Sequence, residues 1–205
     1  MRISDSHRLL FVHVPKTGGA TLERVFDDGI ADVRFERGTR HDTLTQILKV
    51  DPELSGYWIV GFVRNPWARL VSWWSMIDTG RRRAAEGSEP HIRKFETYEV
   101  WAKVREYPDF ETFVTRGGDE IERIRTPQFE FLATPDRRAD FIGRTETMEG
   151  DVERIRDRLG LPLEAKLPHK NRSTHGHYRD YYTPVTRDRV AALYQRDIDE
   201  FGYEF

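Results

Sequence analysis

The sequence contains no cysteine, which excludes disulfide bonds, thiolate zinc sites and cysteine nucleophiles. It also lacks any apolar run near the roughly 18 residues that a membrane-spanning helix needs, and its first residues do not form the apolar stretch of a signal peptide. These absences fit a reducing compartment. We therefore expect a soluble cytoplasmic protein without a transmembrane segment.

The chain also lacks an excess of charge of either sign. Its 33 lysines and arginines nearly balance 35 aspartates and glutamates, for a net charge of -2. A general nucleic-acid binder would be basic, so we expect no nucleic-acid partner, and any anion site must be local. Lysine is scarce, with 6 residues against 27 arginines. Guanidinium groups suit bidentate binding of phosphate or sulfate, but codon composition alone would produce the same bias.

The length and apolar content suit one packed domain. The chain has 205 residues, of which 38% are hydrophobic and 12% are aromatic, so a single core is expected and wholesale disorder is not. No internal repeat and no long linker divides the sequence. We predict one domain spanning residues 1–205.

Two segments predict a strand, a loop and a helix in succession. Residues 8–14 form a short apolar run that Pro15 ends, residues 16–19 carry two glycines, and residues 20–26 have helical apolar spacing. Residues 57–63 form a second apolar run. Asn65 and Pro66 then suit the N-cap and first position of a helix from Trp67 to about Ile77.

Further elements follow the same alternation. We predict strands at residues 33–35 and 139–143, and helices at residues 43–50, at 149–159 ending at Gly160, and from Thr183 to Gly202. Residues 79–90 and 161–179 have the least regular pattern. Strands that alternate with helices imply an α/β fold with a central parallel sheet covered on both faces.

The first glycine loop has the composition of an anion site. After a buried strand, Gly18 and Gly19 let backbone N–H groups and a helix N-terminus converge on one anion, and Lys16 adds a mobile positive charge. The order differs from GxxxxGK[ST], because the lysine precedes the glycines, which disfavours a magnesium-dependent kinase. A simple glycine turn with a solvated lysine is the alternative, but the flanking strand and helix favour the anion site.

The second unit offers another anion site. Arg64 follows the strand, and Ser72 comes eight residues later on the same helix side. Each residue also has an ordinary structural explanation, as an ion pair or a solvated hydroxyl. Together, the two units indicate a ligand with two separated phosphates.

These segments resemble the two signatures of the sulfotransferases, in the branch that includes carbohydrate sulfotransferases and small bacterial members. The matching segments are FVHVPKTGG at residues 11–19 and GFVRNPWARLVS at residues 61–72, with FIGRTE at 141–146, KNRS at 170–173 and the closing segment 181–205. The resemblance covers nearly the whole chain.

The resemblance implies a three-layer fold like that of P-loop NTPases, and a metal-free reaction that uses 3′-phosphoadenosine 5′-phosphosulfate (PAPS) and releases adenosine 3′,5′-bisphosphate (PAP). It implies that the 5′-phosphosulfate is held by residues of the first signature, and the 3′-phosphate by Arg64 and Ser72. The first-signature residues are Lys16, Thr17, Gly18, Gly19, Ala20 and Thr21. Many members carry two hydroxyl residues after the double glycine, whereas this chain has Ala20 before Thr21. Lys170, Asn171 and Ser173 resemble a later loop that contacts the donor.

Transfer to a hydroxyl requires a proton acceptor, and histidine has a suitable pKa of about 6.5. Of seven histidines, His41 resembles the family position that often holds the catalytic base, and Lys16 is expected to stabilise charge on the leaving oxygen. Asp42 is an alternative base. His13 fits a core position, whereas His175 and His177 fit a solvated loop better than a metal site.

The matched motifs concern the donor and leave the acceptor open among polysaccharide, lipid, peptide tyrosine and small metabolite. A basic stretch around Arg81–Arg83, His91, Arg93 and Lys94 would suit an anionic glycan, but equally a solvated surface. One of Trp73 and Trp74 is expected in the core, leaving the other for an acceptor, and Gln128 is a further candidate contact. A nucleotide- or glycan-binding module without turnover, and a magnesium-dependent phosphoryl transferase, are the rival functions.

Overall fold

The computed structural model describes residues 1–35, 40–162 and 176–205. Within it the chain forms two compact units. The first combines Met1–Arg64 with Gln128–Arg172, and the second combines Asn65–Pro127 with Ser173–Phe205. Each unit therefore contains two separate stretches of the chain.

The first unit is built on a four-stranded sheet with the order β1-β2-β3-β4. Its strands are β1 (Arg2–Ser4), β2 (Leu9–Val12), β3 (Trp58–Val63) and β4 (Phe141–Arg144). β2, β3 and β4 are mutually parallel, as predicted, with Leu9 opposite Trp58 and Val60 opposite Phe141. β1 runs antiparallel to β2, so the sheet is mixed. Only three residues long, β1 carries too little pattern to be recognised in the sequence.

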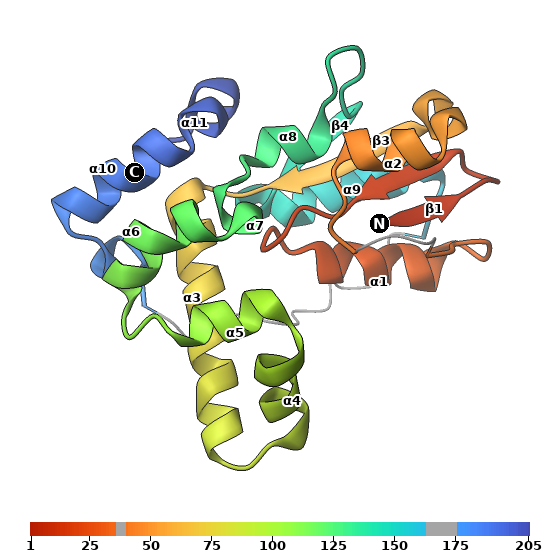
Figure 1. The fold of residues 1–205 in the computed structure, drawn as a ribbon. Helices are drawn as coiled ribbons and strands as arrows, with labels where there is room; N and C mark the ends of the chain where they lie inside the picture. The colour runs from red at the N-terminus through yellow and green to blue at the C-terminus, as the bar shows by residue number, and fades with distance from the viewer. Residues whose placement is uncertain (36–39, 163–175) are drawn as a thin grey trace. The chain divides into compact units, whose positions relative to one another are not determined.

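Helices cover both faces of this sheet (Figure 1). α1 (Gly19–Gly29) and α9 (Met148–Leu159) pack their apolar side chains against one face, on Leu9, Phe11, Val60 and Phe62. Successive strand residues point to opposite faces, and on the other face α8 (Gln128–Leu132) places Leu132 directly over Gly61. α2 (Leu44–Val50) packs beside α8. The first unit thus has the three layers that were expected.

The ends of these helices follow local signals in the sequence. The Thr43 hydroxyl caps α2 by accepting from the Gln46 N–H, and the Gln46 side-chain oxygen accepts from the Thr43 N–H. Gly160 ends α9 in the left-handed conformation with φ of 65°. Two short 3-10 turns complete the unit: η1 (Pro52–Gly56) and η2 (Thr145–Thr147). The predicted strand at residues 33–35 is a single antiparallel bridge between Arg34 and Ile3.

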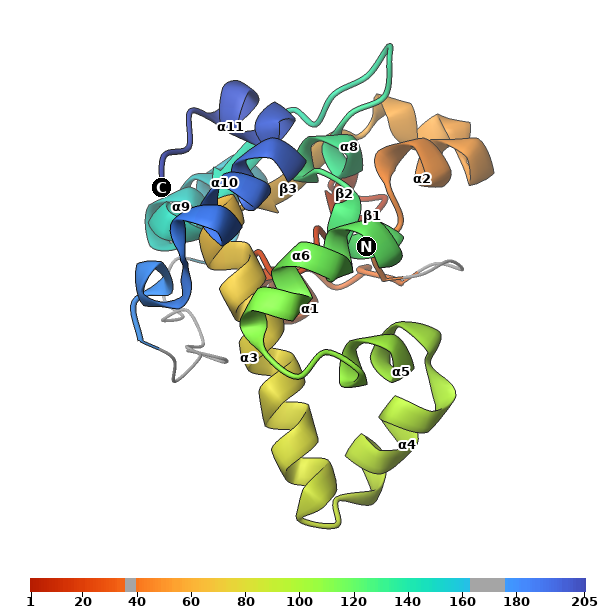
Figure 2. The same ribbon diagram turned by 60° about the vertical axis from the view of Figure 1, so that its left-hand side comes forward.

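The second unit is helical (Figure 2). Its longest element is α3 (Pro66–Ala85), beside which α4 (Glu89–Thr97) and α5 (Glu99–Arg105) pack as a pair. The other elements are α6 (Phe110–Glu120), α7 (Glu122–Arg125), η3 (Tyr178–Tyr181), α10 (Pro184–Leu193) and α11 (Gln195–Phe201). Their shared core is rich in aromatic residues, including Trp67, Trp73, Tyr107, Phe113 and Tyr194.

Two predictions for this unit were wrong. Helix α3 continues to Ala85, through residues that were predicted to be irregular. Arg81 holds that part of the helix in place, because its guanidinium donates to the backbone carbonyls of Val104 and Tyr107 and lies over the ring of Trp74. The closing helix is two helices, with a break at Tyr194, where φ is -116° and ψ is 29°.

In the described ranges, no helix has both the length and the apolar character needed to cross a bilayer.

Candidate active site

The first glycine loop, residues 15–19, leaves β2 and enters α1 through two left-handed residues. Lys16 has φ of 71° and Gly18 has φ of 79°. A lysine in this conformation is uncommon and strained, and such strain is concentrated at functional sites. The Thr17 hydroxyl donates to the Val14 carbonyl at 2.9 Å, and the Thr21 N–H donates to the Gly18 carbonyl at 2.9 Å. The loop is therefore fixed with left-handed backbone at two positions, a type of conformation that can turn N–H groups toward one anion.

Both glycines of the loop are required by their surroundings. A Cβ on Gly18 would overlap the end of Met148, in addition to the positive φ. A Cβ on Gly19 would overlap the imidazole ring of His13. The double glycine thus brings His13, which directly follows β2, up against the start of α1.

The threonine of the third matching segment joins this loop to the end of β3. Thr145 Oγ1 lies 3.0 Å from the Thr17 carbonyl oxygen and 3.1 Å from the Val63 carbonyl oxygen. Asp151 fixes the turn that carries Thr145, because its carboxylate accepts from the Arg144 N–H at 2.9 Å and from the Thr147 hydroxyl at 2.7 Å. The carboxyl ends of β2, β3 and β4 are therefore tied together.

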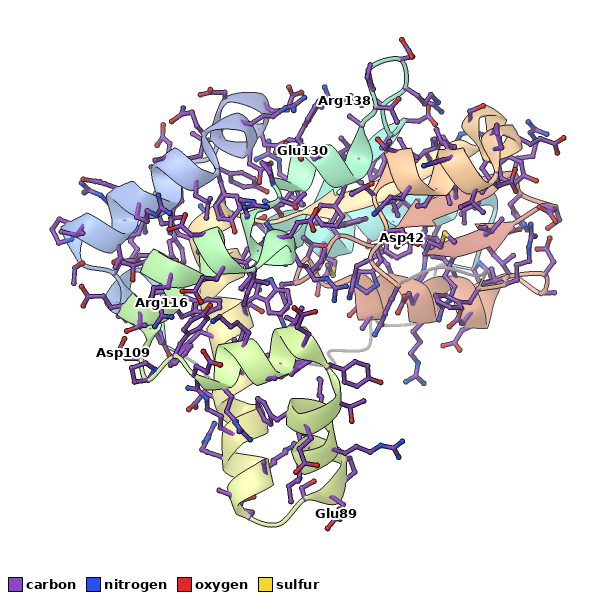
Figure 3. The ribbon with its side chains drawn as sticks, in the orientation of Figure 1. Asp42, Glu89, Asp109, Arg116, Glu130 and Arg138 are labelled. Atoms are coloured by element: carbon purple, nitrogen blue, oxygen red, sulfur yellow. The ribbon has the colours of Figure 1, made fainter. Side chains whose placement is uncertain are left out.

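His41 lies beside this loop in the tautomer that a base requires. Its Nδ1 is 3.0 Å from the backbone carbonyl oxygen of His13. A carbonyl only accepts hydrogen bonds, so Nδ1 carries the proton, and Nε2 keeps its lone pair. The edge of the His41 ring packs on the His13 ring, with 4.6 Å between centroids. Asp42, the alternative base, lies in the turn before α2 (Figure 3).

His13 is a buried residue, as predicted, but it belongs to a charged cluster. Its Nδ1 lies 3.0 Å from Glu23 Oε1, and Glu23 also pairs with the guanidinium groups of Arg2 and Arg40. Burial lowers the pKa of His13, against the raising effect of Glu23. Burial raises the pKa of Glu23, but its bonds with His13 and Arg40 outweigh this and bring that pKa to about 2. Glu23 is therefore ionised, and His13 is neutral, at physiological pH.

The backbone of Arg64 is clamped by Gln128. The side-chain amide accepts from the Arg64 N–H at 2.9 Å and donates to the Arg64 carbonyl at 2.8 Å. Gln128 is 0% exposed, so the interpretation of this residue as an acceptor contact was wrong. It fixes the point at which β3 ends.

The remaining predicted residues belong to the second unit or lie outside the described residues. Ser72 is a buried residue of α3, in the second unit. Lys170, Asn171, Ser173 and His175 lie outside the described residues. His177 is exposed and caps η3. Trp74, considered as an acceptor contact, packs against Phe110 and Phe113.

No group of three His, Asp or Glu side chains in residues 1–35, 40–162 and 176–205 is arranged to hold a metal ion. The polar centre of the first unit is made instead of arginine, histidine and one carboxylate, joined by hydrogen bonds.

Three residues of this site were missed in the sequence: Glu23, Thr145 and, in its true role, Gln128. Thr145 stands in the matching segment at residues 141–146 and Gln128 was noted for another role, whereas Glu23 left a signal in the helical pattern. Residues 19, 22, 23 and 26 share one side of a helix, so Glu23 falls within the apolar stripe of α1, where a charged side chain needs partners.

Comparison with known sequences identifies the family of this chain. The model of the sulfotransferase family matches residues 1–204. This chain belongs to the sulfotransferase family. It is 26% identical over 209 residues to carbohydrate sulfotransferase 14 of Danio rerio, with 92% of this chain and 53% of that protein covered. The chain thus spans about half the length of this curated relative.

Among solved structures, the chain is similar to mouse sulfotransferase SULT7A1 complexed with PAP. The TM-score is 0.49 at 13% identity, with 95% of this chain and 86% of that chain covered.

Proposed function

We propose that the protein transfers a sulfuryl group from PAPS to a hydroxyl group of an acceptor. The acceptor oxygen attacks sulfur in line, the bond between sulfur and the phosphate oxygen breaks, and PAP leaves with that electron pair. The hydroxyl proton passes to the base. The atoms and charges of this step balance without a metal ion. Positioning and fixed electrostatics stabilise the group in transfer.

The glycine loop fits the 5′-phosphosulfate end of this donor. Left-handed backbone at Lys16 and Gly18 turns N–H groups inward, and α1 begins at Gly19. In this proposal the residues from Lys16 to Thr21 bind the phosphosulfate, and the Lys16 ammonium group stabilises the negative charge that grows on the leaving oxygen. Ala20 supplies only its backbone N–H.

The 3′-phosphate is assigned to Arg64 and Ser72. Support for Arg64 comes from its backbone, which Gln128 fixes where β3 ends, at the sheet edge where ligands bind in open α/β folds. Ser72 and the loop residues Lys170, Asn171 and Ser173 are carried in the proposal by the motifs alone.

The observation that carries the proposal is the tautomer of His41. With Nδ1–H donated to the His13 carbonyl, Nε2 is the ring nitrogen that we assign to accept the acceptor's proton. Asp42 is the competing base. Replacing each in turn separates them.

The acceptor class is proposed from the relative's name. The protein from Danio rerio is called a carbohydrate sulfotransferase, and we propose a carbohydrate hydroxyl, within an anionic glycan, as the acceptor here. This part of the proposal depends on no residue described above.

The donor is tested by calorimetric titration with PAP, with ATP and magnesium as the comparison. Selective binding of PAP by the parent supports the donor assignment. Arg64→Ala should lower the affinity for PAP and leave the affinity for adenosine 5′-phosphate unchanged. Preference for ATP overturns it.

The base is tested by turnover of PAPS with a panel of hydroxyl acceptors. We expect His41→Ala to lower the rate by about 10²–10⁴-fold and to leave PAP binding unchanged. His7→Ala is the control, because His7 lies in the turn before β2, at the opposite end of the strand. Full activity in His41→Ala with loss in Asp42→Asn would assign the base to Asp42.

A further inference from the structure

We propose that Glu23 is the positioning residue for His41, holding the base from two sides through His13 and Arg40. This inference rests on the proposed function, because it concerns the orientation of the base. It adds a residue of α1 that lies outside every matched motif.

The first observation is that Glu23 is a buried carboxylate at a junction of basic groups. It is 4% exposed, and its carboxylate faces His13 Nδ1 at 3.0 Å, Arg2 Nη1 at 3.5 Å and the guanidinium of Arg40. A buried charge of this kind is stable only while it is paired and hydrogen-bonded. Its position therefore determines the positions of its partners.

One path from Glu23 to the base runs through His13. The carboxylate only accepts, so the His13 Nδ1 is the donor, and this bond fixes the imidazole ring against Gly19. The His41 ring packs edge-on against that fixed ring and donates its Nδ1–H to the His13 carbonyl. The plane and the tautomer of His41 are thus set by a residue that Glu23 holds.

The other path runs along the chain. Arg40 immediately precedes His41, and its guanidinium donates to both carboxylate oxygens of Glu23, from Nε at 3.1 Å and from Nη2. The Arg40 side chain is 49% exposed, and within the described ranges Glu23 is the carboxylate that orients its guanidinium. The ion pair fixes the backbone from which the His41 side chain extends.

The charged groups around His41 allow the role of Glu23 to be tested through the pKa of the base. Among the described residues, the ionisable groups in contact with it or with its supports are His13, Glu23, Arg2, Arg40 and the N-terminal ammonium group of Met1, which donates to the Arg40 carbonyl oxygen at 3.1 Å, and Asp42 follows it in the chain. A negative Glu23 stabilises the imidazolium form of His41, and a positive Arg40 destabilises it. The two partners of one ion pair therefore act on the base in opposite directions.

The experiment is the pH dependence of kcat/KM for PAPS-dependent transfer in Glu23→Gln and Arg40→Gln. A base must be unprotonated, so the acid limb reports its pKa. We expect the limb to move down by about half a pH unit or more in Glu23→Gln and up by a similar amount in Arg40→Gln. Both variants should lose roughly tenfold in kcat, and Arg40→Lys should recover part of it.

Asp27→Asn is the matched control. Asp27 lies one turn further along α1 and pairs with the same Arg2, but its side chain is 43% exposed, and in the part of the chain that the structure describes its connection to His41 runs through Arg2 and Glu23. Its kcat and pH profile should equal those of the parent. PAP affinity should stay unchanged in all the variants, which shows that the donor loop is intact.

The inference is supported if the acid limb of the pH profile moves in opposite directions in Glu23→Gln and Arg40→Gln while PAP affinity stays unchanged. Shifts in the same direction, or parental profiles in Glu23→Gln and Arg40→Gln while His41→Ala is inactive, would overturn it and leave the proposed function standing. Full activity in His41→Ala would remove the proposed function itself. Should Glu23→Gln not fold, Arg40→Gln decides alone, because its half-exposed side chain is not needed for the core.

Discussion

At the scale of single residues, the glycine loop is shaped by what surrounds it. Gly18 has positive φ and lies under Met148, and Gly19 lies under the His13 ring. The space above Gly19 is filled by an imidazole that Glu23 holds, so the loop and the proposed base share one packing unit. A methyl group in the loop should therefore disturb both.

We predict that Gly19→Ala destabilises the fold by about 1–3 kcal/mol, the usual cost of overpacking, and weakens PAP binding. Gly150→Ala is the control, because Gly150 lies in α9 with nothing within 4 Å of a built Cβ. Removing a helical glycine there should stabilise by about 0.5–1 kcal/mol. Urea unfolding and PAP titration measure both effects, and an unchanged Gly19→Ala would show that His13 moves aside freely.

At the scale of elements, short connections hold the strand ends in place. Thr145 joins the loop after β2 to the end of β3, and Gln128, the first residue of α8, pairs with the N–H and the carbonyl of Arg64. Gln128 comes 64 residues after Arg64. One amide side chain thus pairs with both backbone groups of Arg64, at the point where the chain leaves the sheet.

We predict that Gln128→Leu costs about 1–3 kcal/mol, because the Arg64 N–H and carbonyl lose the hydrogen bonds that the Gln128 amide supplies. It should also lower PAP affinity, since Arg64 loses its fixed backbone. Gln195→Leu, at an exposed position of α11, should stay within about 0.5 kcal/mol of the parent. Chemical denaturation and calorimetry test this. If Gln128→Leu is destabilised but binds PAP with the parental affinity, Gln128 contributes to the stability of the fold and not to PAP binding.

At the scale of the whole molecule, arginine provides many of the bonds between separate segments. Arg137 donates to the carbonyls of Ser55 and Tyr57 and pairs with Asp140, so it joins the segments that precede β3 and β4. Arg81 joins α3 to the end of α5, because its guanidinium donates to the carbonyls of Val104 and Arg105. Five donors in a fixed fork allow one guanidinium to bridge several carbonyls. Part of the arginine bias is therefore structural, although anion binding was one explanation considered.

Acid stability should depend on Glu23. Its pKa falls from 4.5 to about 2 on folding, so its contribution is complete above the unfolded value and is lost as the pH falls from 4.5 toward 2. We predict that Glu23→Gln is less stable than the parent at neutral pH and that the two stabilities converge over this acid range. Thermal unfolding at several pH values measures it. A constant difference down to pH 2 would contradict the pairing.

The single domain over residues 1–205 stays a prediction, which unfolding tests. The chain passes from one compact unit to the other three times, after Arg64, Pro127 and Arg172, so neither unit is one continuous segment. We predict one cooperative transition, with equal calorimetric and van't Hoff enthalpies. Two transitions, or an excess of calorimetric enthalpy, would show that the units unfold separately.

The sequence by itself determined the elements whose signals are local. The glycine loop, the Asn65 and Thr43 caps, the stop at Gly160 and the parallel strands β2, β3 and β4 follow from neighbouring residues and short periodicities. Its motifs also identified the family, because these motifs are contiguous, whereas the role of His41 as the base stays a prediction.

Only the tertiary structure decided the rest. Antiparallel β1, the full length of α3 and the new role of Gln128 depend on partners far along the chain. The cluster of Glu23, His13 and Arg40 joins residues 10 and 17 positions apart. Helical and strand patterns relate residues within about four positions. A charged residue within an apolar helical stripe therefore predicts that partners exist, but only the fold shows which residues they are.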